Sequence, residues 1–189
     1  MMRTDTSLPG VCVLQPVVHP DGRGYFLETY NQRTFNDVGI ESVFVQDNES
    51  CSQKGVLRGL HYQLAHPQTK LVRVLAGEIF DVAVDVRRGS PTFGRWVGET
   101  LSAENKKMLL VPEGFAHGFL VMRDMTQVAY KCSDFYAPAE ERGVIWNDPV
   151  LAIAWPLEGD PILSDKDRAY DRLADCDPEQ LPIFGEGGS

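Results

Sequence analysis

The sequence predicts an all-β domain, an antiparallel sandwich or jelly-roll barrel with a few short helices. Apolar and polar residues alternate in many short runs, turn signals separate these runs, and long helical patterns are almost absent. With 189 residues, the chain is long enough to bury one core without disulfide bonds or metal ions. We therefore expect a single domain over 1–189, with a jelly-roll core at about 14–155 and a C-terminal helical segment at about 160–189.

The strand-like runs follow one another along the middle of the chain. In 79–86, Phe80, Val82 and Val84 form one apolar face while Asp81 and Asp85 share the other, which predicts a strand with two different surfaces. The other runs of this kind are 26–30, 43–46, 55–63, 70–75, 96–101, 107–112, 118–122 and 128–132. Turn signals at 20–24, 76–77, 88–91, 112–114 and 123–124 separate them.

Two short segments have a helical pattern. Residues 31–38 form an amphipathic run that ends near Gly39. Residues 165–174 form a polar run that opens after Ser164, a residue type that caps helix N-termini. Both helices are minor, so they do not change the predicted fold class.

The charge is unevenly distributed along the chain. The net charge is -9, and 157–189 supplies -6 of it, with nine acidic against three basic residues. The rest is close to neutral, which argues against nucleic-acid binding, and no apolar run is long enough to span a membrane. The four scattered cysteines form no metal-binding or disulfide pattern, so we expect a cytoplasmic protein; the last residues, 185–189, have the composition of a flexible tail.

An arginine and a histidine lie three residues apart in one strand-like run. In a regular strand, Arg58 and His61 would point to opposite faces. Gly59 between them is a candidate β-bulge, which would turn both side chains into one pocket. Such a pair suits proton chemistry on an anionic substrate. The alternative is a hydrogen-bonded core histidine beside a surface arginine.

Ionisable residues recur on the strand-like runs, where each must be paired, functional or exposed at an edge. They are Arg58, His61, Lys70, Asp81, His117 and Tyr130. His117 ends a Pro-x-Gly-x-x-His spacing that also occurs in metal-binding cupin barrels. A metal cage needs about three ligands, but the earlier position reads His61-Tyr62-Gln63 and no acid follows before Glu78. We therefore expect a cupin-like barrel without a metal site, whose ligands are replaced by acid-base residues.

Several motifs together resemble one enzyme family. They are Gly55-Val-Leu-Arg-Gly-Leu-His-Tyr-Gln63, Val111-Pro-Glu-Gly-Phe-Ala-His-Gly-Phe119, Gln46-Asp-Asn48, Phe80-Asp-Val-Ala-Val-Asp85, Ser90-Pro-Thr-Phe93, Leu101-Ser-Ala-Glu-Asn105, Gly143-Val-Ile-Trp-Asn-Asp148 and Leu163-Ser-Asp-Lys-Asp167. In this order they resemble the dTDP-4-dehydrorhamnose 3,5-epimerase family of dTDP-L-rhamnose synthesis. The resemblance covers about 14–167.

The resemblance implies an activity that uses no cofactor. The implied substrate is dTDP-4-keto-6-deoxy-D-glucose, whose C4 ketone acidifies the protons on C3 and C5. By similarity, His61 is the base, Asp167 is the carboxylate that orients it, and Tyr130 donates a proton to the opposite face. Lys70 matches the position that stabilises the enolate.

The resemblance also implies how the substrate is bound. Arg23 and Lys166 match positions that contact the diphosphate, and Tyr136 matches one that stacks on thymine. The hydrogen-bonding neighbours are Glu28, Gln46, Asn48 and Glu141, and Arg58 and His117 are expected to line the same pocket. Family members are homodimers with exchanged N-terminal strands, so Arg23 is a candidate for the adjacent subunit's site.

Other functions remain open from the sequence. A mono-epimerase acting at C3 or C5, or a ketoisomerase of a related nucleotide sugar, would share this pocket. Gln63 and the missing acid disfavour a metal-dependent cupin oxygenase. The combination of His61, Asp167 and Tyr130 disfavours a binding module without catalysis.

Overall fold

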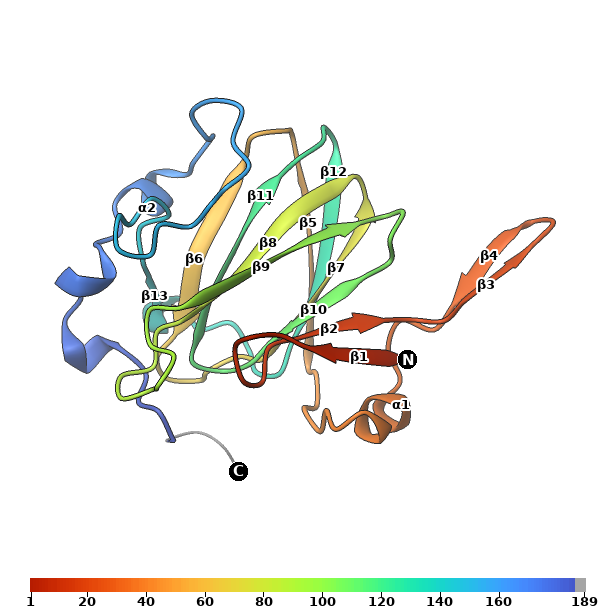
Figure 1. The fold of residues 1–189 in the computed structure, drawn as a ribbon, viewed down its shortest axis with the longest axis horizontal. Helices are drawn as coiled ribbons and strands as arrows, with labels where there is room; N and C mark the ends of the chain where they lie inside the picture. The colour runs from red at the N-terminus through yellow and green to blue at the C-terminus, as the bar shows by residue number, and fades with distance from the viewer. Residues whose placement is uncertain (186–189) are drawn as a thin grey trace.

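In the computed structural model, which describes residues 1–185, two antiparallel sheets pack face to face and a separate hairpin projects from them (Figure 1). In spatial order, the six-stranded sheet contains β1 (Met2–Asp5), β2 (Cys12–Gln15), β10 (Met108–Val111), β7 (Lys70–Ala76), β12 (Thr126–Cys132) and β5 (Gln46–Ser52). The five-stranded sheet contains β13 (Glu141–Gly143), β6 (Leu57–Gln63), β11 (Phe115–Val121), β8 (Glu78–Asp85) and β9 (Trp96–Ser102). The hairpin pairs β3 (Val18–Asp21) with β4 (Gly24–Leu27). The predicted cupin-like, all-β jelly roll is confirmed.

Helices are few and short. The α-helices are α1 (Gln32–Asp37) and α2 (Asp165–Arg168), and the 3-10 turns are η1 (Pro138–Glu140), η2 (Leu173–Asp175) and η3 (Pro178–Gln180). Ser164 caps α2 as predicted, because its hydroxyl accepts the Asp167 N–H. The helix predicted over 165–174 is too long, since the chain leaves the helical path after Arg168. The end of the predicted C-terminal segment and of the predicted tail, residues 186–189, lies outside the described residues.

The main core lies between the two sheets, where side chains alternate with period two. On β7, Val72 and Val74 point into this core, while Leu71 points to the outer face. On β8, Ile79 and Ala83 face inward. Asp81 and Asp85 share one face, as the sequence predicts, and their parity with Ile79 and Ala83 places both on the inner face of this strand.

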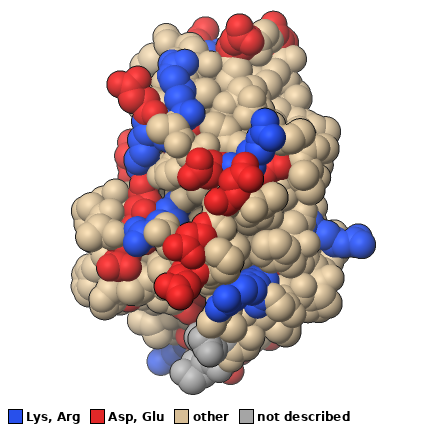
Figure 2. All heavy atoms as spheres, turned by 90° about the vertical axis from the view of Figure 1, so that its left-hand side faces the viewer, with Lys and Arg blue, Asp and Glu red and all other residues tan. Residues whose placement is uncertain are grey.

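The outer face of each sheet is covered by a different segment. Helix α1 places Phe35 against Leu14 and Leu110 of the six-stranded sheet. The C-terminal segment places Leu173 and Leu181 against the outward-facing valines of β8. Most acidic side chains of this segment stay at the surface, Asp167 being buried, and basic groups lie among acidic ones on the face shown in Figure 2. The segment therefore covers the sheet with its apolar residues.

Several strand predictions require correction. The run predicted over 43–46 is wrong, because the strand in this region is β5 and begins at Gln46. The run predicted over 26–30 is only the end of β4, which stops at Leu27. Strands β1, β2, β3 and β13 lacked a sequence prediction, and each has only three or four residues. So short a strand shows little period-two alternation.

The β3–β4 hairpin extends away from the barrel (Figure 1). Phe26 on it is 71% exposed and Tyr25 is 57% exposed. Exposed aromatic residues on a projecting hairpin are typical of a surface that binds another chain. Among the described residues, no helix is long and apolar enough to span a membrane.

Candidate active site

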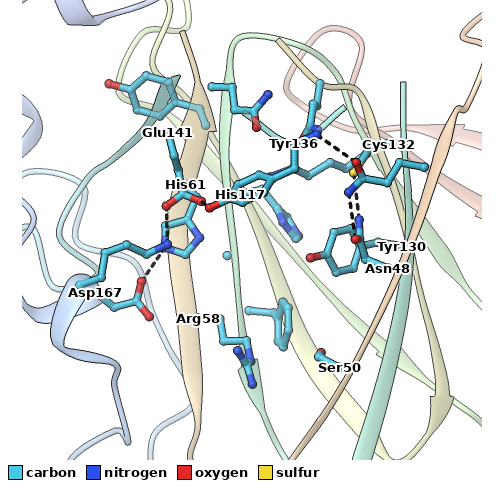
Figure 3. A pocket seen from close by; sticks show the side chains of 18 of the residues that line it. Asn48, Ser50, Arg58, His61, His117, Tyr130, Cys132, Tyr136, Glu141 and Asp167 are labelled. Atoms are coloured by element: carbon cyan, nitrogen blue, oxygen red, sulfur yellow. Dashed lines mark hydrogen bonds and ion pairs between the residues drawn. The ribbon is translucent and has the colours of Figure 1, made fainter. Parts of the chain in front are cut away.

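A pocket of about 550 Å³ lies between the two sheets, and polar side chains from both sheets line it (Figure 3). Strands β6 and β11 supply His61 and His117, and strands β7 and β12 supply Lys70 and Tyr130. Most of the remaining polar groups come from β5, β13 and the start of α2, and Gln68 and Tyr136 come from loops. The jelly roll thus brings residues from separate parts of the chain to one cavity.

His61 and Asp167 form a hydrogen-bonded pair in this pocket. The distance from His61 Nε2 to Asp167 Oδ1 is 2.5 Å, and the other carboxylate oxygen accepts a hydrogen bond from the Ser164 hydroxyl at 2.7 Å. Burial favours the neutral acid, but the hydrogen bonds from His61 and Ser164 prevail and lower the pKa of Asp167. An ionised Asp167 fixes the His61 tautomer with Nδ1 as the free basic nitrogen.

The predicted β-bulge at Gly59 is confirmed by the pairing of β6 with β11. His61 pairs with His117 and Arg58 pairs with Phe119, so three steps along β6 match two steps along β11. The extra residue turns Arg58 to the inner face, and both Arg58 and His61 line the pocket. Gly59 has φ of 117°, and a Cβ there would lie 2.5 Å from the Gly118 Cα. Two glycines therefore allow the strands to approach at this point.

A second histidine–carboxylate pair lies deeper in the pocket. His117 Nε2 is 2.6 Å from Asp81 Oδ1, and Asp81 is completely buried. The other Asp81 oxygen has no hydrogen-bond partner among residues 1–185. His117 faces the pocket and Asp81 lies behind it, so the carboxylate orients the imidazole from the core side.

Lys70, Cys132 and Tyr130 form the wall contributed by the six-stranded sheet. Burial lowers the pKa of the Lys70 ammonium, and the nearby Cys132, Glu141 and Asp81 only partly oppose this effect. Burial raises the pKa of Tyr130, while the positive charge of Arg58 acts in the other direction. Tyr130 therefore keeps its proton at neutral pH and can donate it.

Glu141 joins the groups at the pocket entrance. Its carboxylate accepts hydrogen bonds from the Lys166 ammonium and from the Tyr136 and Tyr170 hydroxyls. Burial favours the neutral acid, but the hydrogen bond from Lys166 and the charge of His61 lower the pKa of Glu141. Tyr136 is half exposed, which leaves its ring available to stack on a planar group.

The β5 side chains complete the entrance next to Tyr136. The Gln46 amide donates to Asn48 Oδ1 at 3.0 Å and accepts the Tyr136 backbone N–H at 2.9 Å. Asn48 Nδ2 in turn donates to Cys132 Sγ at 3.5 Å. These contacts hold two amides at the edge of the pocket, where they present donors and acceptors to a polar ligand.

Two predicted binding residues lie elsewhere in the single chain. The Arg23 side chain is 90% exposed at the tip of the β3–β4 hairpin and pairs with Asp21 at 2.6 Å. Glu28 accepts hydrogen bonds from Asn31 and Thr34 at 2.9 Å each. Neither residue lines the pocket of its own chain, whereas the other eleven predicted site residues do.

The site contains histidine and carboxylate side chains, which are residue types that also bind metal ions. Within residues 1–185, no three His, Cys, Asp or Glu side chains lie close enough together to hold a metal ion. His61 and His117 instead each bond one carboxylate. The donor set of the pocket is thus arranged as two hydrogen-bonded pairs and not as one cage.

Known proteins are similar to this chain over most of its length. The sequence profile of a family described as dTDP-4-dehydrorhamnose 3,5-epimerase matches residues 5–175. The chain belongs to this epimerase family. A dTDP-4-dehydrorhamnose 3,5-epimerase from Pseudomonas aeruginosa is 55% identical over 94% of this chain and 98% of its own.

Solved structures of epimerase relatives have the same fold. A dTDP-6-deoxy-D-glucose-3,5-epimerase from Legionella pneumophila in complex with dTDP-4-keto-L-rhamnose has a TM-score of 0.94 and 50% identity, and the match covers 97% of this chain and 98% of that one. A 3'-monoepimerase from Streptomyces bikiniensis in complex with dTDP-quinovose has a TM-score of 0.90 and 38% identity, with 95% and 92% covered. The fold is therefore common to the double and the single epimerases.

Sequence reasoning missed some residues in and beside the pocket. Cys132 lies two residues after Tyr130 on β12, so strand parity alone would have placed its thiol on the pocket side. Tyr170 lies beside His61, with ring centroids 5.6 Å apart, but comes from an irregular segment that gives no such signal. The Ser164 hydroxyl was expected only as a helix cap, and it also bonds the Asp167 side chain.

Proposed function

We propose that the protein epimerises C3 and C5 of dTDP-4-keto-6-deoxy-D-glucose to give dTDP-4-keto-L-rhamnose, a step of dTDP-L-rhamnose synthesis. The observation that carries the proposal is the placement of His61 and Tyr130 on opposite sheets of one pocket (Figure 3). Inversion at a carbon needs a base on one face and an acid on the other. The near full-length match to relatives named for this reaction supports the substrate.

In the proposed mechanism, His61 removes the proton next to the ketone. Asp167 stabilises the imidazolium that forms, because its carboxylate accepts a hydrogen bond from the Nε2–H group, with 2.5 Å between nitrogen and oxygen. The electron pair moves onto O4, where the Lys70 ammonium stabilises the enolate; such stabilisation is worth about 10²–10³ in rate. Tyr130 then donates its proton to the opposite face, and exchange with water restores both side chains before the second carbon reacts.

The entrance of the pocket is the proposed site of the nucleotide. Tyr136 stacks on the thymine ring, and Lys166 contacts the diphosphate. The hydrogen-bonding neighbours are Gln46, Asn48 and Glu141, with Arg58 and His117 along the sugar. Arg23 and Glu28 complete the proposed set from a second chain, because neither lies in the pocket of its own chain.

A homodimer with exchanged N-terminal strands is part of the proposal. Among the described residues, strand β5 is the last strand of the six-stranded sheet. Its outer edge is therefore free to pair with a strand of a second chain. The β3–β4 hairpin projects away from the barrel and exposes Tyr25 and Phe26. We place the protein in the cytoplasm, because all four cysteines are free thiols, as is usual in a reducing compartment.

Incubation with dTDP-4-keto-6-deoxy-D-glucose in D₂O tests the proposal, with deuterium at C3 and C5 read separately by NMR. We expect label at both carbons without added nicotinamide or metal. Label at one carbon would instead support a mono-epimerase, the second candidate, which the 38% identical 3'-monoepimerase favours. The absence of label at both would contradict the proton-transfer function.

His61→Ala provides the matched control for this experiment. We expect its exchange at both carbons to fall by about 10²–10⁴, the usual effect of losing a general base. The folded state of the variant is checked by its circular dichroism spectrum. Exchange close to that of the unmodified protein would remove His61 as the base.

A further inference from the structure

Tyr170 contacts two groups of the site without lining the pocket. Its ring meets the His61 imidazole edge-on, with centroids 5.6 Å apart and an angle of 62° between the ring planes. Its hydroxyl donates to Glu141 Oε1 at 3.2 Å. A single side chain behind the wall of the pocket thus contacts both the proposed base and the carboxylate at the entrance.

The position of the Tyr170 ring is closely defined. A Cβ on Gly143 would lie 2.5 Å from the Tyr170 Cζ atom, so the ring fills the space that a side chain would take on β13. Gly143 is also the residue that pairs with His61 across β13 and β6. The backbone carbonyl of Asp171 accepts the Ile145 N–H at 2.9 Å, which anchors the chain directly after Tyr170.

The contacts of Tyr170 restrict two motions. Asp167 holds His61 through one ring nitrogen, and one hydrogen bond leaves the imidazole free to tilt about that contact. The Tyr170 ring blocks this tilt on one side. At Glu141, the same oxygen accepts from Tyr170 and from Lys166, so the hydroxyl limits where the carboxylate and its lysine partner can lie.

The Tyr170 hydroxyl is also suited to act as a permanent donor. Burial raises the pKa of this phenol, and the nearby carboxylates of Glu141 and Asp167 raise it further. The group therefore remains protonated at neutral pH, where Glu141 is ionised. Its hydroxyl can then donate to the carboxylate.

We propose that Tyr170 is a positioning residue for both halves of the reaction site. Its ring holds the His61 imidazole in the orientation for proton abstraction. Its hydroxyl holds Glu141, and through it Lys166 and Tyr136, in the arrangement that binds the nucleotide. The inference rests on the proposed function, and it assigns the two effects to different atoms of one side chain.

Two variants of the full-length protein separate these effects. Tyr170→Phe keeps the ring and removes the hydroxyl, so we expect kcat within about twofold while KM and the Kd for dTDP rise about 3–10-fold. Tyr170→Leu also removes the ring, so we expect kcat to fall about 10–100-fold, since small misplacements of a catalytic group are costly. The readouts are deuterium exchange at C3 and C5, and calorimetric binding of dTDP.

Tyr30→Phe serves as the matched control, because it removes a tyrosine hydroxyl that bonds Gln32, beside α1 and outside the pocket. We expect its kcat and KM to be unchanged. If Tyr170→Leu does not fold, Tyr170→Met replaces it. The unbranched methionine side chain adapts to the shape of the space and also lacks a ring.

Two results would overturn the proposal. Unchanged kcat in folded Tyr170→Leu would remove the role at His61, and unchanged dTDP affinity in Tyr170→Phe would remove the role at Glu141. A protein without any exchange activity would contradict the proposed function. The dTDP affinities of the variants would still test the Glu141 half, so the two failures are distinguishable.

Discussion

At the scale of single residues, burial acts in opposite directions on the pKa values of Tyr130 and Lys70, the two groups of the six-stranded sheet that we propose to meet the sugar. It raises the pKa of the Tyr130 phenol and lowers the pKa of the Lys70 ammonium. The phenol thus keeps its proton to higher pH, and the ammonium loses its proton at lower pH, than each group would in water. Burial thus favours the protonated phenol that the proposed donor role needs, and it disfavours the charged ammonium that the proposed enolate-stabilising role needs.

Tyr130→Phe tests the donor. Because the phenol acts after His61 has removed a proton, we expect deuterium exchange to persist better than net inversion, which should fall about 10²–10⁴-fold. The measurement compares label at C3 and C5 with the amount of product of inverted configuration. Equal loss of exchange and inversion would contradict a donor that acts only in the second step.

Lys70 provides a prediction on pH. A lowered pKa means that the ammonium loses its charge below pH 10.5, whereas Tyr130, with a raised pKa, keeps its proton beyond pH 10. We expect kcat to decline on the alkaline side as Lys70 is deprotonated. Lys70→Arg keeps a cation at all accessible pH values, so its smaller kcat should persist to higher pH. An alkaline decline at the same pH in both proteins would assign it to another group.

Some of these residues could be predicted from sequence and others could not. Strand parity marked Lys70, Asp81 and Tyr130 as ionisable groups on strands that need an explanation. The pairing of His61 with Asp167 came only from the family resemblance, since 106 residues separate the two. No local pattern encodes such a contact, because tertiary packing alone brings it about.

At the scale of elements, the β6–β11 pairing determines how the site is presented. The bulge at Gly59 places Arg58 and His61 on one face, and close approach at Gly118 leaves no room for a side chain on either strand. A regular strand would turn Arg58 out of the pocket. The glycine in the motif therefore serves the geometry of the site as well as the sheet.

Gly59→Ala is expected to destabilise the protein by about 3 kcal/mol or more, because the methyl group meets the backbone of β11 and φ is positive. Gly159→Ala is the matched control, since its added Cβ has no atom within 4 Å. We expect a change below about 0.5 kcal/mol there. Urea unfolding of both variants measures the difference, and similar midpoints would show that the bulge tolerates a side chain.

The elements that sequence analysis missed have physical reasons. On β5, Gln46, Asn48 and Ser50 face the pocket, so the inner face of this strand is polar and lacks the apolar alternation of a core strand. After Arg168, the chain places Tyr170 on His61 and Leu173 in the outer core, two surfaces that one helix face cannot reach together. Helical propensity yields to these contacts.

At the scale of the whole molecule, the proposed site needs two chains. Arg23 lies at the tip of a hairpin that projects from the barrel, outside the pocket of its own chain. In a symmetric dimer, each hairpin would complete the site of the other chain. The proposed diphosphate contact and the base would then come from different subunits.

Mixing two defective variants tests this arrangement. Arg23→Ala lacks the phosphate contact and His61→Asn lacks the base, so neither homodimer has a complete site. Random exchange of equal amounts should restore about a quarter of the native sites, since half of the dimers are mixed and each has one intact pair. The measurement is the activity that reappears with the KM of the unmodified protein. A mixture no more active than the two separate variants would indicate that Arg23 does not complete the site of the other chain.

The separation of His61 from Asp167 has a consequence for protein synthesis. A ribosome makes the N-terminal part of a chain first, and the strands of both sheets end at Gly143, before α2 begins at Asp165. The strands that carry His61 are therefore synthesised before the carboxylate that holds it. A chain that stops before Asp167 would lack this partner and also Leu173 and Leu181, which cover the five-stranded sheet, so the proposed base would be set only when the last segment has emerged and docked.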